Sequence, residues 1–376
     1  MPNLVLLLEL GAIAVVFAGI PLFYLWTRSS YSIFQKLNWV LVFMTFDLIV
    51  FGAFTRLTDS GLGCPDWPGC YGTSNPFRAL SEIQQAESAM PTGPVTVMKA
   101  WIEMIHRYLA MTVGALILIQ VGMAYSKVKM LGKTPFIASL GLLLLVCIQG
   151  AFGAWTVTLK LQPIIVTIHL MLALILLACL TAYAQQTWEQ MSASVRTLRI
   201  RPLPASWLVV SFLFLLMQVF LGAWVSTNYA VLACPDFPTC LGSAWPETNW
   251  SEGFSLWRQL GLNAQGEFIS PVALQTIHWA HRLFAVLVLL CLGALGLKAY
   301  QLSTPATPML KRFAVLLLSL LLLQVLTGIS NVVFQWPLIA ALMHTAGSAA
   351  LVFCLVRMGY WASWKSPIQL KNAKSL

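Results

Sequence analysis

The histidines of this 376-residue chain are few, and their spacing repeats. His106 and His281 are 175 positions apart, and so are His169 and His344. The fifth histidine, His278, has no histidine counterpart, because Glu103 stands at the equivalent position. Ionisable side chains within apolar segments are costly and usually serve a function. The four repeated histidines are therefore the first candidates for chemistry.

Two imidazoles that face each other across a helical bundle can hold haem iron from both sides. Hydrogen bonding to a neighbouring helix is the alternative, but two pairs in the same register favour ligation. Zinc would need further ligands in each pair. A carboxylate-bridged di-iron site needs two E-x-x-H motifs and two more glutamates, and Glu103-x-x-His106 is the only such motif in the sequence. The pattern predicts two haem sites, one at His106 and His169 and one at His281 and His344.

Glu103 distinguishes the two predicted sites. It lies three residues before His106, on the same face of the expected helix. Two equal sites would suit electron transfer, whereas one site with an added carboxylate suggests a reaction there and electron storage at the other. Glu103 could move protons or stabilise a developing cation, and a helix-capping or interfacial role is the alternative. His278 could be a hydrogen-bond donor to a ligand or an interfacial residue.

An arginine directly follows one histidine in each pair. Arg107 and Arg282 are expected near the membrane surface, where a guanidinium suits the carboxylate of a haem propionate. A long side chain that only extends to the interface is the equally weighted alternative. The sequence therefore predicts possible propionate contacts at both arginines.

Two short loops carry a repeated pair of cysteines, in the sequences CPDWPGC at 64–70 and CPDFPTC at 234–240. Both loops are expected outside the cell, where disulfides persist. We therefore predict the bonds Cys64–Cys70 and Cys234–Cys240. Neither loop has the C-x-x-C spacing of thiol oxidoreductases. A structural role for the disulfides in bracing the loops is therefore preferred to a role in thiol–disulfide exchange.

The composition points to a membrane protein, with 59% hydrophobic and only 9% charged residues. A membrane span needs about 20 mostly apolar residues, and lipid requires them to be helical. Nine stretches meet this length, at about 4–26, 39–57, 103–124, 136–158, 165–187, 206–228, 272–297, 313–333 and 338–361. We predict an all-α integral membrane protein with nine transmembrane helices.

Basic residues are concentrated in alternate loops, which the positive-inside rule places in the cytoplasm. They are Arg28, Lys36, Lys127, Lys129, Lys133, Arg196, Arg199, Arg201, Lys298, Lys311, Arg312, Lys365, Lys371 and Lys374. The N-terminus is then outside, the C-terminus is cytoplasmic, and the net charge of +10 is a topology signal that gives no case for nucleic-acid binding. The first segment lacks the basic start and small-residue cleavage site of a signal peptide, so a retained helix is expected. The absence of an Arg- and Ser-rich transit peptide favours a bacterial plasma membrane.

An internal repeat organises these spans. Residues 52–70 and 222–240 both begin with Gly-Ala-aromatic and end with the cysteine loop, at a spacing of 170. Each copy holds four spans, and an even number gives both copies the same orientation, so they form a parallel repeat. We predict an extra N-terminal helix with its cytoplasmic loop at 1–37, an N-terminal four-helix bundle at 38–203, and a C-terminal four-helix bundle with a cytoplasmic tail at 204–376.

Three stretches together resemble the haem A synthase family. They are RLTDSGLGCPDWPGCYG at 56–72, EMIHRYLA at 103–110 and CPDFPTCLG at 234–242. The resemblance runs from about residue 38 to about residue 361, and it is specific only in combination. Simpler family members have eight spans, so the resemblance assigns no role to the extra first helix.

The resemblance implies oxidation of haem O to haem A, in which the porphyrin C8 methyl group becomes a formyl group for use in terminal oxidases. His106 and His169 would bind the substrate haem, with Glu103 as the essential acid beside it. His281 and His344 would hold a haem b cofactor, although His278 could also ligate iron. A farnesyl-transferring haem O synthase and an electron donor are the expected partners, and the sequence leaves the oligomeric state open.

Two other classes of function remain open from the residues alone. A di-haem electron carrier would need no acid, and the presence of Glu103 in one copy only argues against it. A membrane thiol–disulfide oxidoreductase would use the cysteine pairs and would carry no haem absorption.

Overall fold

The computed structural model describes residues 32–192, 198–199, 203–305, 307–362 and 365–366. Within these ranges, eight helices are long and apolar enough to cross a membrane, and the chain is a multi-pass membrane protein. They are α2 (Ile33–Leu57), α4 (Val97–Ser126), α6 (Lys133–Thr158), α7 (Pro163–Ser192), α8 (Ala205–Thr227), α10 (Pro271–Gln301), α11 (Pro308–Val333) and α12 (Leu338–Ala362). The first predicted span, 4–26, lies outside the described residues.

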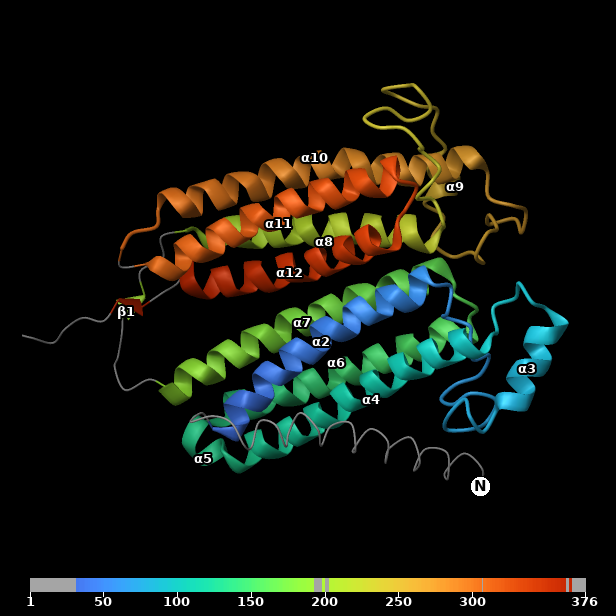
Figure 1. Ribbon diagram of the computed structural model, residues 1–376. Helices are drawn as coiled ribbons and strands as arrows, with labels where there is room; N and C mark the ends of the chain where they lie inside the picture. The colour runs from blue at the N-terminus through green and yellow to red at the C-terminus, as the bar shows by residue number, and fades with distance from the viewer. Residues whose placement is uncertain (1–31, 193–197, 200–202, 306, 363–364, 367–376) are drawn as a thin grey trace, which may run out of the picture.

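Shorter elements connect these helices. They are α3 (Leu80–Ala89), α5 (Val128–Leu131), α9 (Trp250–Gly253) and the two-residue strands β1 (Leu198–Arg199) and β2 (Lys365–Ser366), which pair antiparallel. The two long connections, which hold α3 and α9, lie at the same end of the long helices (Figure 1). We call this end the loop end.

Helices α2 and α4 each begin six residues earlier than their apolar windows predict, and a capping residue before each first turn explains the difference. Helix α2 begins after Ser32, whose side chain accepts a hydrogen bond from the Gln35 amide at 3.3 Å. Helix α4 begins after Thr96, which caps Lys99 in the same way at 3.2 Å. Such caps satisfy backbone donors at a helix start, and a hydropathy window does not detect them.

The long helices form two groups of four with the same order of neighbours. In the first group α2 packs on α4, α4 on α6, α6 on α7, and α7 on α2. In the second group α8 packs on α10, α10 on α11, α11 on α12, and α12 on α8. The groups meet where α7 and α2 contact α12 and where α7 contacts α8 (Figure 1).

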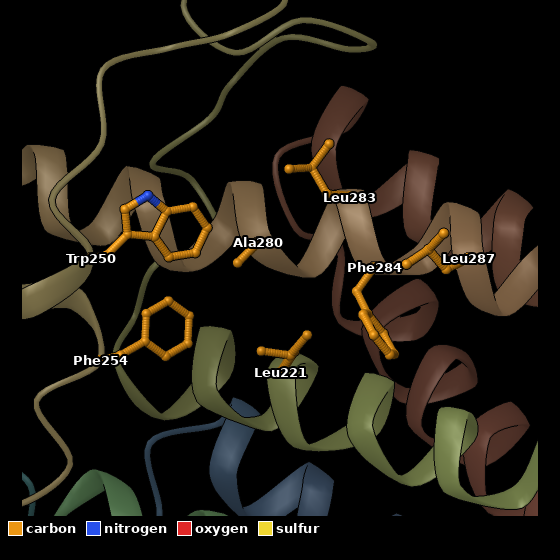
Figure 2. Close-up of a pocket in the computed structure, with 7 residues that line it drawn as sticks. All are labelled: Leu221, Trp250, Phe254, Ala280, Leu283, Phe284 and Leu287. Carbon is orange, nitrogen blue, oxygen red and sulfur yellow. The ribbon is translucent and has the colours of Figure 1, made fainter. Parts of the chain in front are cut away.

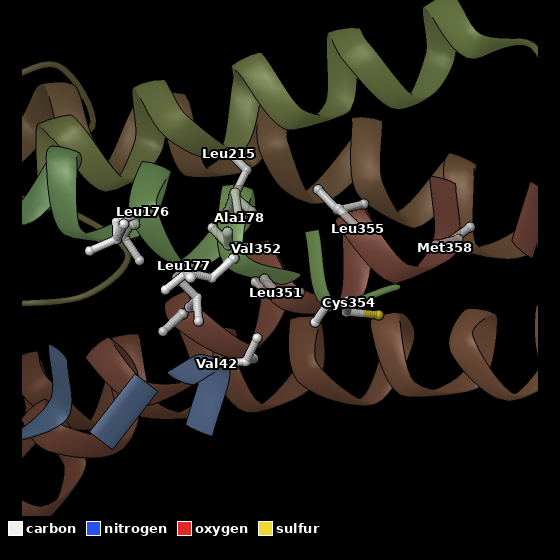
Figure 3. Close-up of a cluster of buried hydrophobic side chains, with 14 of the residues drawn as sticks. Val42, Leu176, Leu177, Ala178, Leu215, Leu351, Val352, Cys354, Leu355 and Met358 are labelled. Carbon is white, nitrogen blue, oxygen red and sulfur yellow. The ribbon is translucent and has the colours of Figure 1, made fainter. Parts of the chain in front are cut away.

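An apolar core joins the two groups. Val42 of α2, Leu177 of α7 and Val352 of α12 belong to one cluster of buried side chains (Figure 3). Large apolar side chains also lie exposed on the outer helices, such as Ile137 and Leu144 of α6, which are 62% and 64% exposed. Water would disfavour such surfaces, and contact with lipid accounts for them.

Candidate functional site

The four repeated histidines all lie near the loop end of their helices. His106 is on α4, His169 on α7, His281 on α10 and His344 on α12, each within about three turns of the helix start. None of the four is fully buried, so each pair retains accessible surface.

The two histidines of the C-terminal pair face each other. The ring centroids of His281 and His344 are 6.5 Å apart, and the ring planes are inclined by 77°. A metal–imidazole bond is about 2 Å long and the ring centre lies about 1 Å behind the nitrogen, so two imidazoles on opposite sides of one iron have centroids roughly 6 Å apart. The observed separation fits haem ligation.

A glycine of a neighbouring helix lies against each of the four imidazoles. A Cβ atom built at these glycines would approach the ring carbon Cε1 closely: Gly52 to His106 at 3.0 Å, Gly153 to His169 at 3.1 Å, Gly222 to His281 at 2.9 Å and Gly328 to His344 at 3.4 Å. A Cβ atom at Gly52, Gly153 or Gly222 would press the ring away from the neighbouring helix, whereas at Gly328 it would be in ordinary contact with His344. The four glycines are therefore part of how the histidines are positioned.

Hydrogen bonding does not account for the N-terminal pair. The Nδ1 atoms of His106 and His169 are buried and have no hydrogen-bond partner in the structure. Buried polar atoms are rarely left unsatisfied without a functional reason. The two rings are thus not held by hydrogen bonds at Nδ1, and with the glycine cradles the residues present are suited to haem.

Glu103 and Arg107 connect α4 to the first cysteine loop. Glu103 is only 3% exposed, and its carboxylate accepts hydrogen bonds from the Cys64 amide at 2.8 Å and from the Arg107 guanidinium. Arg107 also donates to the carbonyl oxygens of Asp66, at 2.8 Å, and of Gly69. The carboxylate is therefore held rigidly one turn from His106.

Arg282 makes the equivalent contacts on α10. It donates to the carbonyl oxygens of Asp236 and Thr239, both at 2.8 Å, and of Cys234 at 2.6 Å. Its Nε donates to Nε2 of His278 at 3.2 Å, and His278 is only 4% exposed. His278 thus takes the place of Glu103 as the arginine's partner.

Both arginines are directed into the cysteine loops by these contacts. The sequence analysis expected propionate contacts at Arg107 and Arg282, and those contacts stay a prediction. What the structure adds is a role in holding the loops against the helices, which sequence reasoning did not identify.

Both predicted disulfides are formed. Cys64 is bonded to Cys70 and Cys234 to Cys240, and all four side chains are fully buried. The four remaining cysteines, Cys147, Cys179, Cys291 and Cys354, are free.

An aspartate closes each cysteine loop, and sequence reasoning missed it. Asp236 accepts hydrogen bonds from the backbone amides of Leu241 and Gly242, both at positive φ, at 2.6 and 2.9 Å. Its hydrogen bonds to Thr239 and to these amides lower the pKa of the Asp236 carboxyl to about 2. Asp66 binds the amides of Tyr71 and Gly72 in the same way, at 2.7 Å each. The repeated Cys-Pro-Asp was the available signal for this role.

An apolar pocket of about 410 Å³ lies beside the C-terminal pair, between α8, α9 and α10. Its lining is Leu221, Trp250, Phe254, Ala280, Leu283, Phe284 and Leu287 (Figure 2). No titratable side chain lines it, so it offers no acid or base. Leu221 and Ala280 immediately precede Gly222 and His281, and the pocket therefore flanks the histidine pair.

No group of three or more His, Cys, Asp or Glu residues that could hold a metal ion occurs in the part of the chain that the structure describes. The four repeated histidines lie in two pairs. Two protein ligands suffice for a metal that brings its other ligands with it, as the iron of haem does.

Comparison with known proteins gives a consistent result. Residues 35–356 match the family described as cytochrome oxidase assembly protein, COX15-CtaA. The haem A synthase of Shewanella oneidensis is 38% identical over 339 residues, which cover 88% of this chain and 98% of that protein. The haem A synthases of Brucella ovis and Brucella suis are each 26% identical over 338 residues, covering 85% of this chain and 88% of those proteins.

Proposed function

The chain belongs to the cytochrome oxidase assembly family COX15-CtaA, and we propose on this basis that it is a haem A synthase. It is an oxidoreductase that converts haem O to haem A by oxidising the C8 methyl group to a formyl group. The single observation that carries this function beyond the family match is the asymmetry between the histidine pairs. A buried carboxylate, Glu103, lies beside one pair, and the neutral His278 lies at the same place beside the other.

The N-terminal pair is the substrate site in this proposal. His106 and His169 bind haem O, and the glycine cradle against each ring supports ligation. The C-terminal pair, His281 and His344, holds a haem b cofactor, with ring centroids at a separation that suits one iron. A bound haem supplies the redox chemistry of its iron.

Glu103 is the group that handles protons at the substrate. Conversion of a methyl to a formyl group removes electrons and protons together, so a nearby base assists it. The Cys64 amide and Arg107 hold the Glu103 carboxylate one helical turn from His106. That position also lets the carboxylate stabilise positive charge that develops at the substrate.

The proposed topology places the loop end outside a bacterial plasma membrane. Lys127 and Lys129 follow α4 and Lys298 lies in the last turn of α10, all at the opposite end of the helices, in agreement with a cytoplasmic location. The disulfides then lie in an oxidising compartment. The proposal keeps nine spans, with residues 1–37 preceding two parallel four-helix repeats at 38–203 and 204–376.

The same order of helix neighbours in the two groups supports the proposed repeat. The matching contacts of Arg107 and Arg282 with the two cysteine loops support it further. A farnesyl-transferring haem O synthase is the proposed source of the substrate, and a separate redox partner exchanges electrons with the site.

The test uses a host that makes haem O but no haem A. Extracts of the purified wild type should contain haem A, or a hydroxylated intermediate, together with haem b. The Glu103→Gln variant should retain haem b and make little or no haem A. We expect this variant to fold, because the equivalent arginine, Arg282, already has a neutral partner in His278.

Glu103→His provides a second variant that copies the C-terminal half, and it should also lose haem A formation. Haem A production by Glu103→Gln at the wild-type rate would contradict the division into a reactive and a supporting site. It would mean that haem A formation by this protein does not depend on the Glu103 carboxylate. Wild-type protein without any haem absorption would contradict the proposed function itself.

A further inference from the structure

The two histidine pairs differ in the polar groups that contact the Nδ1 atoms of their rings. The Nδ1 atom of His344 lies 2.9 Å from the Thr327 hydroxyl of α11. That hydroxyl also lies 2.7 Å from the carbonyl oxygen of Leu323, to which it donates. Because a hydroxyl has one proton, its oxygen accepts from Nδ1–H of His344. The contact fixes the tautomer that leaves Nε2 available for iron.

The second C-terminal ring also has a polar neighbour. The side-chain nitrogen of Gln218 on α8 donates to the carbonyl oxygen of His281 at 3.2 Å and lies 3.1 Å from Nδ1 of the same residue. Gln218 therefore holds both the backbone and the ring of His281 in place.

The N-terminal pair lacks both groups. The repeat places Phe152 at the position of Thr327 and Leu48 at the position of Gln218. Neither side chain can hydrogen bond, and the Nδ1 atoms of His106 and His169 are without partners. The sequence therefore departs from the repeat at the two positions that would orient the ligands.

The glutamines that donate to the backbone carbonyl oxygens of the histidines also differ between the two pairs. Gln324 donates to the carbonyl oxygen of His344 at 3.1 Å, and its Oε1 accepts from Ser348 at 3.2 Å. Gln149 donates to the carbonyl oxygen of His169 at 3.0 Å, but its Oε1 is buried without a partner. The C-terminal ligand is thus more completely held.

We propose that Thr327 and Gln218 are positioning residues that make the C-terminal pair a permanent haem site, whereas Phe152 and Leu48 leave the N-terminal pair as a site of haem exchange. Groups that accept from the distant nitrogen of a metal-bound histidine fix its orientation and raise its basicity, and their loss typically costs about 10- to 100-fold in metal affinity. An enzyme whose substrate is itself a haem must release one haem and retain the other. The inference rests on the proposed function and explains how one fold achieves both.

The experiment measures transfer of haem b from the purified full-length protein to an excess of apomyoglobin, and the midpoint potential of the haem that remains bound. Thr327→Val removes the acceptor with little change of shape. It should accelerate haem b loss by about 10- to 100-fold and raise the midpoint potential, because a less basic imidazole stabilises ferric iron less. Gln218→Leu copies Leu48 and should also accelerate haem b loss.

Two further variants separate positioning from stability. Thr327→Ser keeps the hydroxyl and should restore the wild-type rate and potential. Thr181→Val on α7 removes a hydroxyl that bonds only the carbonyl of Leu177 of its own helix, at 2.7 Å, and should change neither quantity. If Thr327→Val does not fold, Gln218→Leu carries the test.

The outcomes distinguish this inference from the proposed function. Wild-type rates and potentials in both Thr327→Val and Gln218→Leu would overturn the inference and leave haem A synthesis standing. Persistence of haem b at the wild-type level in both His281→Ala and His344→Ala would contradict the proposed assignment of the cofactor site.

Discussion

At the scale of single residues, the glycines beside the imidazoles are as important to the two sites as the histidines themselves. Each histidine of the two pairs lies directly against a glycine of a neighbouring helix. Glycine in a helix interior costs about 1 kcal/mol relative to alanine, so this arrangement is maintained against local helix stability. The benefit is that the ring can approach the neighbouring backbone, and the space between the paired rings stays open.

A comparison of two glycines on one helix tests this role. In Gly153→Ala the new methyl group would lie 3.1 Å from Cε1 of His169, so the ring must shift toward its partner. We expect haem O binding at this pair to weaken by about tenfold, a change typical of perturbed ligand orientation. Spectrophotometric titration with haem O measures it.

Gly150→Ala is the matched control, since nothing lies within 4 Å of a Cβ atom at this exposed position one turn earlier on α6. It should bind haem O like the wild type. Equal loss of binding in both variants would show that helix α6 tolerates no substitution and that contact with the ring is not the cause.

At the scale of elements, each cysteine loop is held against its helix by three kinds of contact. A disulfide closes the loop, an aspartate binds two amides within it, and an arginine from the helix binds its carbonyl oxygens. The loop after α8 therefore acts as a rigid extension of α10. In each half, the arginine that binds the loop also contacts the residue that distinguishes the two sites: Arg107 contacts Glu103, and Arg282 contacts His278. The loop therefore also helps to hold that residue in place.

The loop contribution of Asp236 should depend on pH in a defined direction. Its pKa is lowered from an ordinary 3.8 to about 2 by hydrogen bonds to Thr239 and two amides. A lowered folded-state pKa gives stability that is fully present above pH 4 and is lost as the pH falls toward 2. Asp236→Asn should lower the midpoint of thermal unfolding at pH 6, and this difference from the wild type should shrink below pH 4.

Thermal unfolding in detergent across this pH range measures the effect. Glu267→Gln changes an exposed carboxylate in the same connection and serves as the control. A difference between Asp236→Asn and wild type that is constant from pH 6 to pH 2 would mean that the carboxylate charge contributes nothing to loop closure.

At the scale of the whole molecule, a polar contact joins the two groups of helices at the loop end. Arg56 at the end of α2 donates to the carbonyl oxygen of Ser226 at the end of α8, at 2.6 Å, and lies 4.0 Å from the ring centre of Tyr229. The Tyr229 hydroxyl donates to Asp59 at 2.7 Å. Arg56 and Ser226 are repeat equivalents, as are Asp59 and Tyr229, so equivalent positions meet across the junction.

Removal of Arg56 should weaken this junction. Arg56→Ala loses a charged hydrogen bond and a cation–π contact, and we expect about 2 kcal/mol of destabilisation. Tryptophan fluorescence during thermal unfolding in detergent measures it. Arg312→Ala, at an exposed site on α11, should change stability by less than about 0.5 kcal/mol. Equal midpoints for Arg56→Ala and wild type would show that the apolar core alone holds the groups together.

Many features of the structure and function of this protein can be predicted from the sequence alone. Eight of the nine predicted spans are found as helices, and the ninth lies outside the described residues. The family resemblance, the oxidation of haem O and both disulfides are confirmed. These features depend on residues that are close in sequence or on an internal repeat. Runs of apolar residues, short cysteine spacings and equal offsets can all be read without knowing how the helices pack.

Other features were decided only by the tertiary structure. They include the glycines behind the imidazoles, the direction of Arg107 and Arg282 into the loops, and the contact between Thr327 and His344. Each depends on how far a helix is rotated about its own axis. In a soluble protein the apolar stripe reveals that rotation, but a membrane helix is apolar toward both lipid and protein. The sequence therefore fixes which segments cross the membrane, and packing between helices decides which side chains meet.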